Sequence, residues 1–386
     1  MRFDVIIIGG GVIGASVAYH LARLGFGGSI AVFERDPTYR ESSTPRSAGG
    51  IRRLFTSAIN IELSRFSLER YRVFDEEMGL RAEGASIAFK PHGYLFLGRD
   101  EHRPAFRKAY ELERSLGVPV ELLSPPEIRE VVPDLRVEDL TVGLYCADDG
   151  YLDPYTVLMA YVRRSKALGV QWMYETVTAI EGEEGHVAGI RVEGGKRYSA
   201  PVVVNCAGAW GAAISETVGL PLPVVPLPRQ VFVFHPAEPL VRALPLTIDP
   251  SGVYFRHEGE RILTGLAEDV SPSYSLHWSR AFFEAHIWPV LAHRVPKFER
   301  LKLERGWAGL YDDHVNDHSA LIGEHPQLKG YYVALGFSGH GLQHAPAVGQ
   351  ALAERIHYGR YVSIDLTPLR IERIWEREWV GETAIV

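Results

Sequence analysis

The spacing of apolar and polar residues predicts a strand–helix–strand unit at the start of the chain. Residues 3–8 are a short, β-branched apolar run that ends at glycines, as expected of a buried strand. Residues 12–24 have helical spacing, and Gly25 follows as a helix-ending residue. A second strand is expected over residues 29–34, which completes a unit of about thirty residues.

The rest of the chain alternates between helical and strand patterns. Helical spacing is found over residues 60–78, 103–116, 154–168 and 281–292, and again from 341 to about 356. Strands are expected over 93–97, 187–192, 202–205 and 331–335, and antiparallel strands between 231 and 266. Residues 125–133 and 220–228 are rich in proline, so we interpret the first as a loop and the second as a domain boundary or crossover.

The turn between the first strand and the first helix carries a specific motif. Residues 9–14 read Gly-Gly-Gly-Val-Ile-Gly, which matches Gly-x-Gly-x-x-Gly. In this context Gly9 permits a tight turn, Gly11 lets the backbone approach a pyrophosphate, and Gly14 lets the helix pack on the strand. The helix N-terminus favours phosphate, and Glu34 ends the second strand as a candidate ribose ligand. The motif predicts dinucleotide binding without distinguishing a flavin from a nicotinamide cofactor.

The position of this unit and of the later elements predicts an α/β fold with two interleaved domains. A Rossmann-type dinucleotide-binding domain is expected from residues 1–80, 146–219 and 326–386. Residues 81–145 and 220–325 are expected to join as a second, α+β domain, built on a mostly antiparallel sheet that binds the substrate.

Composition excludes several functional classes. The 386 residues carry a net charge of −7 with no basic cluster, which disfavours nucleic acid binding. No apolar run is long enough to cross a bilayer, and we expect a cytoplasmic protein, either a monomer or an oligomer. Cys146 and Cys206 are isolated, so neither a disulfide framework nor a metal site is expected.

Three further segments identify the cofactor by resemblance. Residues 42–52 contain Ser-Ser-Thr and Ser-Ala-Gly-Gly-Ile-Arg, residues 205–210 read Asn-Cys-Ala-Gly-Ala-Trp, and residues 336–341 read Gly-Phe-Ser-Gly-His-Gly. With the first motif they resemble the D-amino-acid-oxidase superfamily of flavoproteins, in its sarcosine oxidase, dimethylglycine dehydrogenase and dye-linked proline dehydrogenase branch. Residues 34–64 are also similar to mitochondrial FAD-dependent oxidoreductase-domain proteins implicated in respiratory complex assembly.

The resemblance implies a bound FAD and names its ligands. The adenosine end would lie at the first glycine motif, the phosphates near Ser43 and Thr44, and the flavin between residues 49–52 and 336–341, with the last helix N-terminus at its pyrimidine side. FAD should be non-covalent, because residues 306–311 hold no cysteine and residues 27–50 no histidine. The implied FAD-binding residues are Gly9, Gly11, Val12, Ile13, Gly14, Glu34, Arg35, Ser42, Ser43, Thr44, Ala48, Gly49, Gly50, Val177, Ala207, Gly208, Trp210, Gly336, Ser338, Gly339, His340, Gly341, Leu342 and Gln343.

The same resemblance implies oxidation of a small amino acid or a secondary or N-methyl amine, such as sarcosine or proline. Hydride transfer to flavin N5 would give an imine that water hydrolyses. Arg52 matches the arginine that binds the substrate carboxylate in sarcosine oxidases. Gln343 stands where those enzymes have a lysine, and the other candidates for contact with the substrate are Tyr254, Arg256 and Tyr311.

Leu263 stands nearest the position of the oxygen-activating lysine of monomeric sarcosine oxidase. We therefore expect a dehydrogenase that passes electrons to a quinone or a protein acceptor rather than to oxygen. Two alternatives remain open: a 2-hydroxy-acid dehydrogenase, and a flavoprotein subunit or assembly factor that needs a partner.

Overall fold

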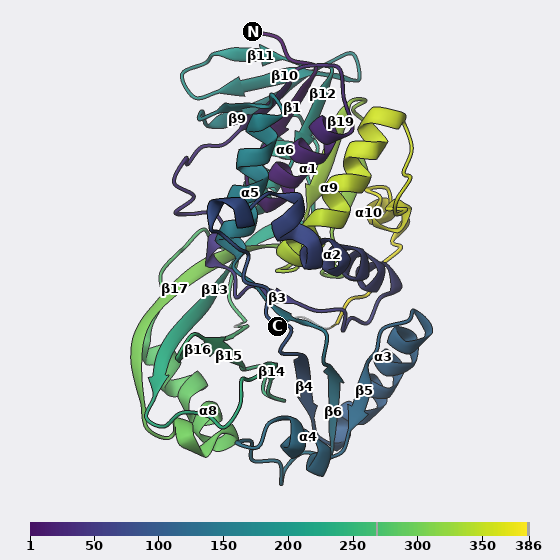
Figure 1. Ribbon diagram of the computed structural model, residues 1–386. Helices are drawn as coiled ribbons and strands as arrows, with labels where there is room; N and C mark the ends of the chain where they lie inside the picture. Colours follow the sequence, from purple (N-terminus) through teal and green to yellow (C-terminus); the bar gives the residue numbers. More distant parts are fainter. Residues whose placement is uncertain (268, 384–386) are drawn as a thin grey trace.

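A six-stranded sheet organises one lobe of the computed structural model, which describes residues 1–267 and 269–383 (Figure 1). Its order is β18-β19-β12-β1-β2-β8, and every neighbouring pair is parallel except β18 with β19. The strands are β1 Val5–Ile8, β2 Ile30–Phe33, β8 Gln171–Met173, β12 Val202–Asn205, β18 Leu321–Glu324 and β19 Tyr331–Leu335. The apolar runs form its centre because both of its faces are covered.

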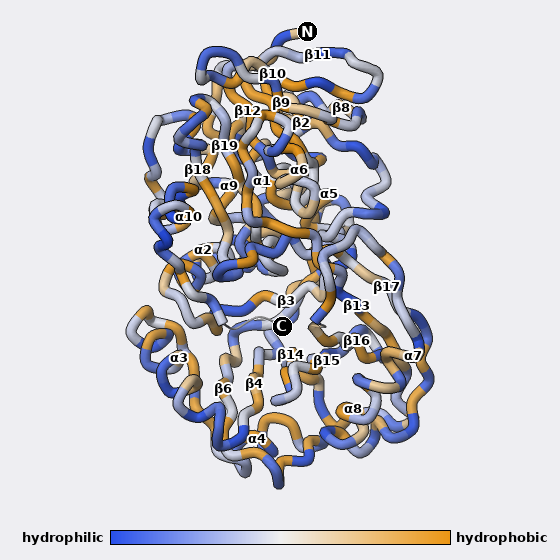
Figure 2. Tube along the Cα trace, turned by 180° about the vertical axis from the view of Figure 1, so that it is seen from behind, coloured by the Kyte–Doolittle hydropathy of each residue, from blue (hydrophilic) through white to orange (hydrophobic). Residues whose placement is uncertain are grey.

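Helices cover one face of this sheet and a small antiparallel sheet covers the other. Val5, Ile7 and Val32 pack with the helices, whereas Ile6 and Phe33 pack with the small sheet. The helices are α1 Val12–Arg23, α2 Ala58–Glu77, α5 Pro154–Ala167 and α9 Gly341–Tyr358. The small sheet consists of β9 Val177–Glu183, β10 His186–Val192 and β11 Arg197–Ser199, with α6 Gly211–Glu216 beside β9. Figure 2 shows the apolar segments concentrated in these central strands and the hydrophilic ones in the surrounding loops.

An eight-stranded sheet forms the second lobe. Its order is β17-β13-β16-β15-β14-β4-β6-β5, and all its pairs are antiparallel except β14 with β4, as the sequence predicted. The strands are β4 Tyr94–Gly98, β5 Glu121–Leu123, β6 Val142–Cys146, β13 Val224–Pro236, β14 Leu246–Ile248, β15 Tyr254–Glu258, β16 Arg261–Leu266 and β17 Leu301–His314. A two-stranded pair, β3 Gly50–Ile51 with β7 Gly150–Tyr151, lies between the two large sheets.

Alternation along the strands separates the two faces of the eight-stranded sheet. Leu95 and Phe232 point to an outer core, which α4 Pro125–Val131 and a second helical segment cover. This second segment consists of α7 Arg280–Phe282, a π-helical turn Phe283–Ile287 and α8 Trp288–Arg294. Tyr94 and Val231, one residue away on the same strands, point to the inner core. α3 Arg103–Ser115 flanks β5 and β6, and α10 Arg373–Glu376 lies near the C-terminus.

Three elements differ from the sequence prediction. Residues 125–131 form α4, because Ser124 and Glu127 form a capping box and Pro125 occupies the first helical position. β13 runs through Pro226 and Pro228. β16 pairs only with residues 230–234 of β13, so the part of β13 that contains the prolines has a neighbouring strand on one side only, where proline is tolerated. β18, which the sequence assigned to the substrate domain, pairs with β19 in the six-stranded sheet.

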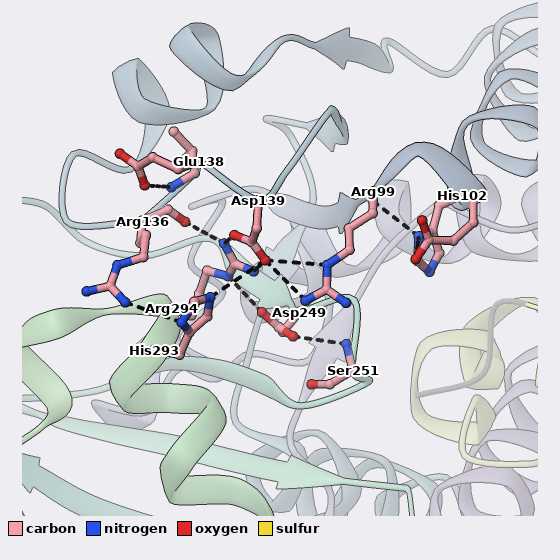
Figure 3. Close-up of polar contacts among 11 residues, drawn as sticks. Arg99, His102, Arg136, Glu138, Asp139, Asp249, Ser251, His293 and Arg294 are labelled. Carbon is pink, nitrogen blue, oxygen red and sulfur yellow. Dashed lines mark hydrogen bonds and ion pairs between the residues drawn. The ribbon is translucent and has the colours of Figure 1, made fainter.

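A buried arginine ties α8 to the outer face of the eight-stranded sheet (Figure 3). The fully buried Arg294 donates to Asp249 Oδ2 over 2.7 Å and to both carboxylate oxygens of Asp139 over 2.8 and 2.9 Å. Arg99, the residue after β4, donates to the same Asp139 carboxylate over 3.1 Å. This cluster fixes the loop before β6 against the helix and lies away from the cavity described below.

Among residues 1–267 and 269–383, no helix is long and apolar enough to span a bilayer. Nor does that part of the chain hold three or more His, Cys, Asp or Glu side chains placed to bind a metal ion.

Candidate active site

A continuous cavity lies between the carboxyl ends of the central parallel strands and the inner face of the eight-stranded sheet. Ile8 at the end of β1, Glu34 after β2 and Cys206 after β12 border it, at the edge where α/β sheets bind their ligands. The predicted FAD-binding residues that line it are Gly9, Gly11, Val12, Ile13, Glu34, Arg35, Ser42, Ser43, Thr44, Ala48, Gly50, Val177, Ala207, Gly208, Trp210, Ser338, Gly339, His340, Gly341, Leu342 and Gln343.

The glycine motif forms the cavity wall below α1. Gly9 has φ +89°, and a Cβ there would lie 2.5 Å from the Cys206 carbonyl oxygen. A Cβ on Gly14 would lie 2.0 Å from the Gly9 carbonyl oxygen, so this glycine lets helix and strand pack and does not itself line the cavity. A Cβ on Gly11 would meet nothing closer than 3.8 Å. The open space at Gly11 is the position where a pyrophosphate would approach the backbone.

Two helices begin at this cavity. α1 starts after Gly11, which has no side chain to cap the helix. α9 starts after His340, whose side chain makes no capping hydrogen bond within the described residues. Thr44 Oγ1 accepts from the Val12 amide over 3.2 Å and satisfies one free donor of α1. Helix N-termini carry a partial positive charge, so this cavity suits an extended anionic ligand such as a dinucleotide.

Glu34 and Trp210 border the end of the cavity that is predicted to hold adenosine. The Glu34 carboxylate accepts from the Gly10 amide over 2.8 Å and from the Asp36 amide over 2.9 Å. Burial raises the pKa of Glu34, and these two hydrogen bonds oppose the shift. Arg35 stacks on the Trp210 ring, with its guanidinium carbon 3.9 Å from the ring centroid.

Arg52 lines the end of the cavity that is predicted to hold the flavin. It is 2% exposed, and its guanidinium carbon lies 4.0 Å from the centroid of the Phe55 ring. Its Nη1 donates to the Leu54 carbonyl, and its Nη2 lies 3.3 Å from His340 Nε2. Its backbone amide donates to Gln343 Oε1 over 3.0 Å, so Gln343 fixes the segment that carries the arginine.

His340 and His344 form a buried pair behind Arg52. Their ring centroids are 5.9 Å apart, and His344 Nε2 lies 3.0 Å from Ser64 Oγ. Burial lowers the pKa of both imidazoles well below the usual value, and the charge of Arg52 contributes to each shift. A neutral His340 can accept from Arg52 through Nε2 only if its proton is on Nδ1.

Three tyrosines line the same end of the cavity. Tyr254 and Tyr311 were predicted from the sequence, and Tyr94 was not. Burial raises the pKa of Tyr94 to about 12 and raises the pKa of the other two as well. All three therefore present neutral hydroxyl groups at physiological pH.

Arg256, a predicted substrate contact, is not among the residues that line the cavity. Its Nε donates to the Ala48 carbonyl over 2.8 Å, and its Nη1 donates to Glu258 Oε2 over 2.5 Å. It joins the eight-stranded sheet to the segment before Arg52. Gly49 and Gly336 also lie outside the lining; a Cβ on Gly49 would meet the Leu152 carbonyl oxygen at 2.2 Å.

Several lining residues were missed by sequence reasoning, among them Arg46, Tyr94 and Arg229. Arg46 donates to the Ala308 carbonyl over 2.6 Å. Alternation with Val231 could have placed Arg229 on the inner face, but that signal requires recognising β13 through its prolines. Tyr94 alternates with Leu95 in the same way, although the pattern does not tell which face meets the cavity.

Comparison with known proteins agrees with this geometry. The family described as "FAD dependent oxidoreductase" matches residues 4–355. "FAD-dependent oxidoreductase domain-containing protein 1" of Xenopus laevis is 36% identical and aligns with 100% of this chain and 85% of its own length. Mitochondrial sarcosine dehydrogenase of Homo sapiens is 29% identical over 92% of this chain and 40% of its own.

Solved structures show the same fold. L-proline dehydrogenase from P. horikoshii superposes with a TM-score of 0.88, with 28% identity, over 98% of this chain and 99% of that one. Glycine oxidase from Geobacillus kaustophilus gives a TM-score of 0.84 with 26% identity, over 96% and 99% of the two chains. The interleaved fold, the dinucleotide cavity and these relationships together lead to one conclusion: the chain belongs to the family of FAD-dependent oxidoreductases.

Proposed function

We propose that this protein oxidises a small amino acid or a secondary or N-methyl amine of the sarcosine or proline kind. The observation that carries the proposal is the buried Arg52, which lines the cavity where the flavin is predicted to lie. A desolvated arginine is the side chain best suited to hold a substrate carboxylate, because its fork donates two parallel hydrogen bonds. The relationship to sarcosine and proline dehydrogenases supports the same substrate class.

FAD, when bound, would supply the two-electron oxidation that converts the amine substrate to an imine. The residues around Gly11, Glu34 and the N-termini of α1 and α9 would hold this cofactor. Arg52 would orient the substrate through its carboxylate, and Gln343 keeps the Arg52 backbone in place. Orientation of this kind supplies much of the rate in such reactions, because the reacting atoms meet without further ordering.

Acid–base groups have a small part in the proposed reaction. The cavity offers neutral tyrosine hydroxyls and a neutral His340, and the pKa of the buried Asp312 carboxyl, which accepts from the Gly336 amide, is raised to about 6 by burial. An amine that binds without its extra proton needs no base, and water completes the reaction by hydrolysing the imine. We therefore place the work of this site in positioning and in excluding water.

The test is anaerobic reduction of the bound flavin. The FAD-loaded protein is mixed in turn with sarcosine, L-proline, the dicarboxylic N-methyl-aspartate, D-alanine, glycine and L-2-hydroxyglutarate, and the visible flavin absorbance is followed. Rapid bleaching by a secondary amine is expected, and no bleaching by any amine would contradict the proposal. Bleaching by the hydroxy acid with a ketone product would favour a 2-hydroxy-acid dehydrogenase, whereas bleaching that requires a co-purified subunit would favour a partner-dependent flavoprotein.

Substrate affinity of the variants Arg52→Lys and Arg52→Ala tests whether Arg52 binds the substrate carboxylate. Removal of a bidentate, desolvated charge pair costs about 2–5 kcal/mol, so the alanine variant should weaken substrate binding by at least about thirtyfold. The lysine variant keeps the charge and should recover part of the loss. Equal substrate affinity in all three proteins would remove Arg52 from the substrate site.

A further inference from the structure

Arg229 is a second arginine on the substrate side of the cavity. It lies on β13 opposite Gly309 of β17, and alternation places it on the same face as Val231, which also lines the cavity. Its guanidinium carbon lies 5.4 Å from the centroid of the Tyr311 ring. Tyr311 pairs with Leu227, two residues before Arg229 on the same strand.

The charges of Arg229 and Arg52 both influence the pKa of the Tyr311 hydroxyl. Burial raises the pKa of the Tyr311 hydroxyl, and the positive charges of Arg229 and Arg52 both oppose that shift. Arg52 acts in the same way on Tyr94, and Arg229 on Tyr254. Arg229, Arg52 and the three tyrosines all line the same cavity.

Other charged groups also face Arg229. Asp313, on the same face of β17 as Tyr311, accepts from His318 Nδ1 over 2.8 Å. Burial opposes ionisation of Asp313, but His318 and then Arg229 hold its pKa below the usual range. Arg229 Nη1 donates to the Pro228 carbonyl over 3.2 Å. These contacts hold the side chain at the cavity wall.

We propose that Arg229 binds a second carboxylate of the substrate, so that the protein acts on a dicarboxylic amino acid with a secondary or N-methyl amine. The inference rests on the proposed function, because it assigns the first carboxylate to Arg52. A monocarboxylic substrate would leave an apolar arm against the Arg229 guanidinium, and a site built for a charged group rejects an analogue that lacks it. Arg229 is thus the residue that determines specificity for the side arm.

Inert acids test this inference without turnover. The FAD-loaded protein is titrated with succinate, glutarate and adipate, and with butyrate, valerate and hexanoate, at constant ionic strength, while the visible flavin spectrum is followed. The best dicarboxylate should bind about tenfold more tightly, or better, than the monocarboxylate of equal length. Arg229→Gln should abolish that preference and leave monocarboxylate affinity nearly unchanged.

A matched variant and a milder one complete the experiment. Arg305 on β17 stacks on Trp307 at 5.7 Å and does not line the cavity, so Arg305→Gln should keep the preference. Arg229→Lys carries the test if the glutamine variant does not fold, and it should lose part of the preference because lysine lacks the planar fork. Unchanged preference in either Arg229 variant, or none in the wild-type protein, overturns the inference.

The outcomes separate this inference from the proposed function. A dicarboxylate preference that depends on Arg229, in a protein whose flavin no amine reduces, would keep the second anion site and reject amine oxidation. Rapid reduction by sarcosine or proline, without any dicarboxylate preference, would do the reverse.

Discussion

Glycines at positions 11 and 14 have different tasks in the same turn. A methyl group on Gly11 would enter open space beside Thr44, in the region where the pyrophosphate is expected. A methyl group on Gly14 would collide with the Gly9 carbonyl. The motif therefore contains one glycine that serves the ligand and one that serves packing.

Gly11→Ala should fold with an unfolding midpoint close to that of the wild-type protein but retain little FAD. Gly14→Ala should be destabilised by more than about 1 kcal/mol, because backbone atoms rather than a flexible side chain must move. Flavin content and thermal unfolding of the apoproteins measure both effects. Full FAD occupancy in Gly11→Ala would contradict the assignment of the pyrophosphate to this position.

Glu113 is a buried carboxyl group on α3, outside the cavity lining. Burial raises its pKa to about 9, and the neighbouring Asp149 carboxylate adds to the shift. The unfolded chain releases this proton near pH 4.5, so folding takes up a proton between those values. Stability must then fall as pH rises across this range, because the folded state binds more protons than the unfolded state.

Glu113→Gln should remove that dependence, since glutamine does not titrate. Relative to the variant, the free energy of unfolding of the wild-type protein should decrease by up to about 1.4 kcal/mol per pH unit between pH 5 and 9. Urea unfolding at several pH values gives the comparison, with the exposed Glu111→Gln on the same helix as control. Parallel pH profiles for wild type and Glu113→Gln would show that Glu113 ionises normally.

At the scale of elements, α8 depends on one buried ion cluster. Arg294 is fully buried and pairs with Asp139 and Asp249. The Arg294 hydrogen bonds hold the pKa of Asp139 well below its usual range despite partial burial. The contribution of Asp139 to stability is therefore present above its unfolded pKa and is lost as pH falls toward the folded value.

Arg294→Met should lower the free energy of unfolding by about 3–5 kcal/mol, because two carboxylates lose a buried partner. Arg99→Met, at the half-exposed rim of the same cluster, should cost less than about 1 kcal/mol. Both variants should bind FAD, since neither side chain lines the cavity. Similar losses in the two variants, measured by denaturant unfolding, would show that burial does not set the strength of this cluster.

At the scale of the molecule, the inner face of the eight-stranded sheet determines what surrounds the reacting end of the cavity. Leu263 is 2% exposed there and packs among apolar residues of the inner core. A cation near flavin N5 would stabilise the negative charge that forms when oxygen is reduced. Leu263 stands nearest the position of the oxygen-activating lysine and does not supply one. Because Arg52 and Arg229 are assigned to substrate carboxylates, we expect a quinone or an acceptor protein to take the electrons instead.

The reduced protein should therefore react with oxygen at least about tenfold more slowly than with an artificial quinone at equal concentration. A tenfold ratio of rates corresponds to a difference of about 1.4 kcal/mol in the activation barrier. Stopped-flow reoxidation of the flavin measures both rates. A faster reaction with oxygen would identify an oxidase.

The sequence by itself determined the features that depend on short spacing. The strand–helix–strand unit, the turn at residues 9–14 and the helix after residue 341 follow from local periodicity and from backbone positions that require glycine. The family resemblance extended this to the FAD-binding segments, and most of the residues that it implied line one cavity.

Tertiary structure decided what depends on pairing between distant segments. β13 continues through its prolines because β17 pairs with its whole length, and β18 joins the other sheet because β19 lies beside it. Arg256 turns to the Ala48 carbonyl, whereas Arg229 meets Tyr311 beside Arg52. The face on which a strand residue lies follows from alternation, but which face meets the cavity is set only when the two sheets pack together.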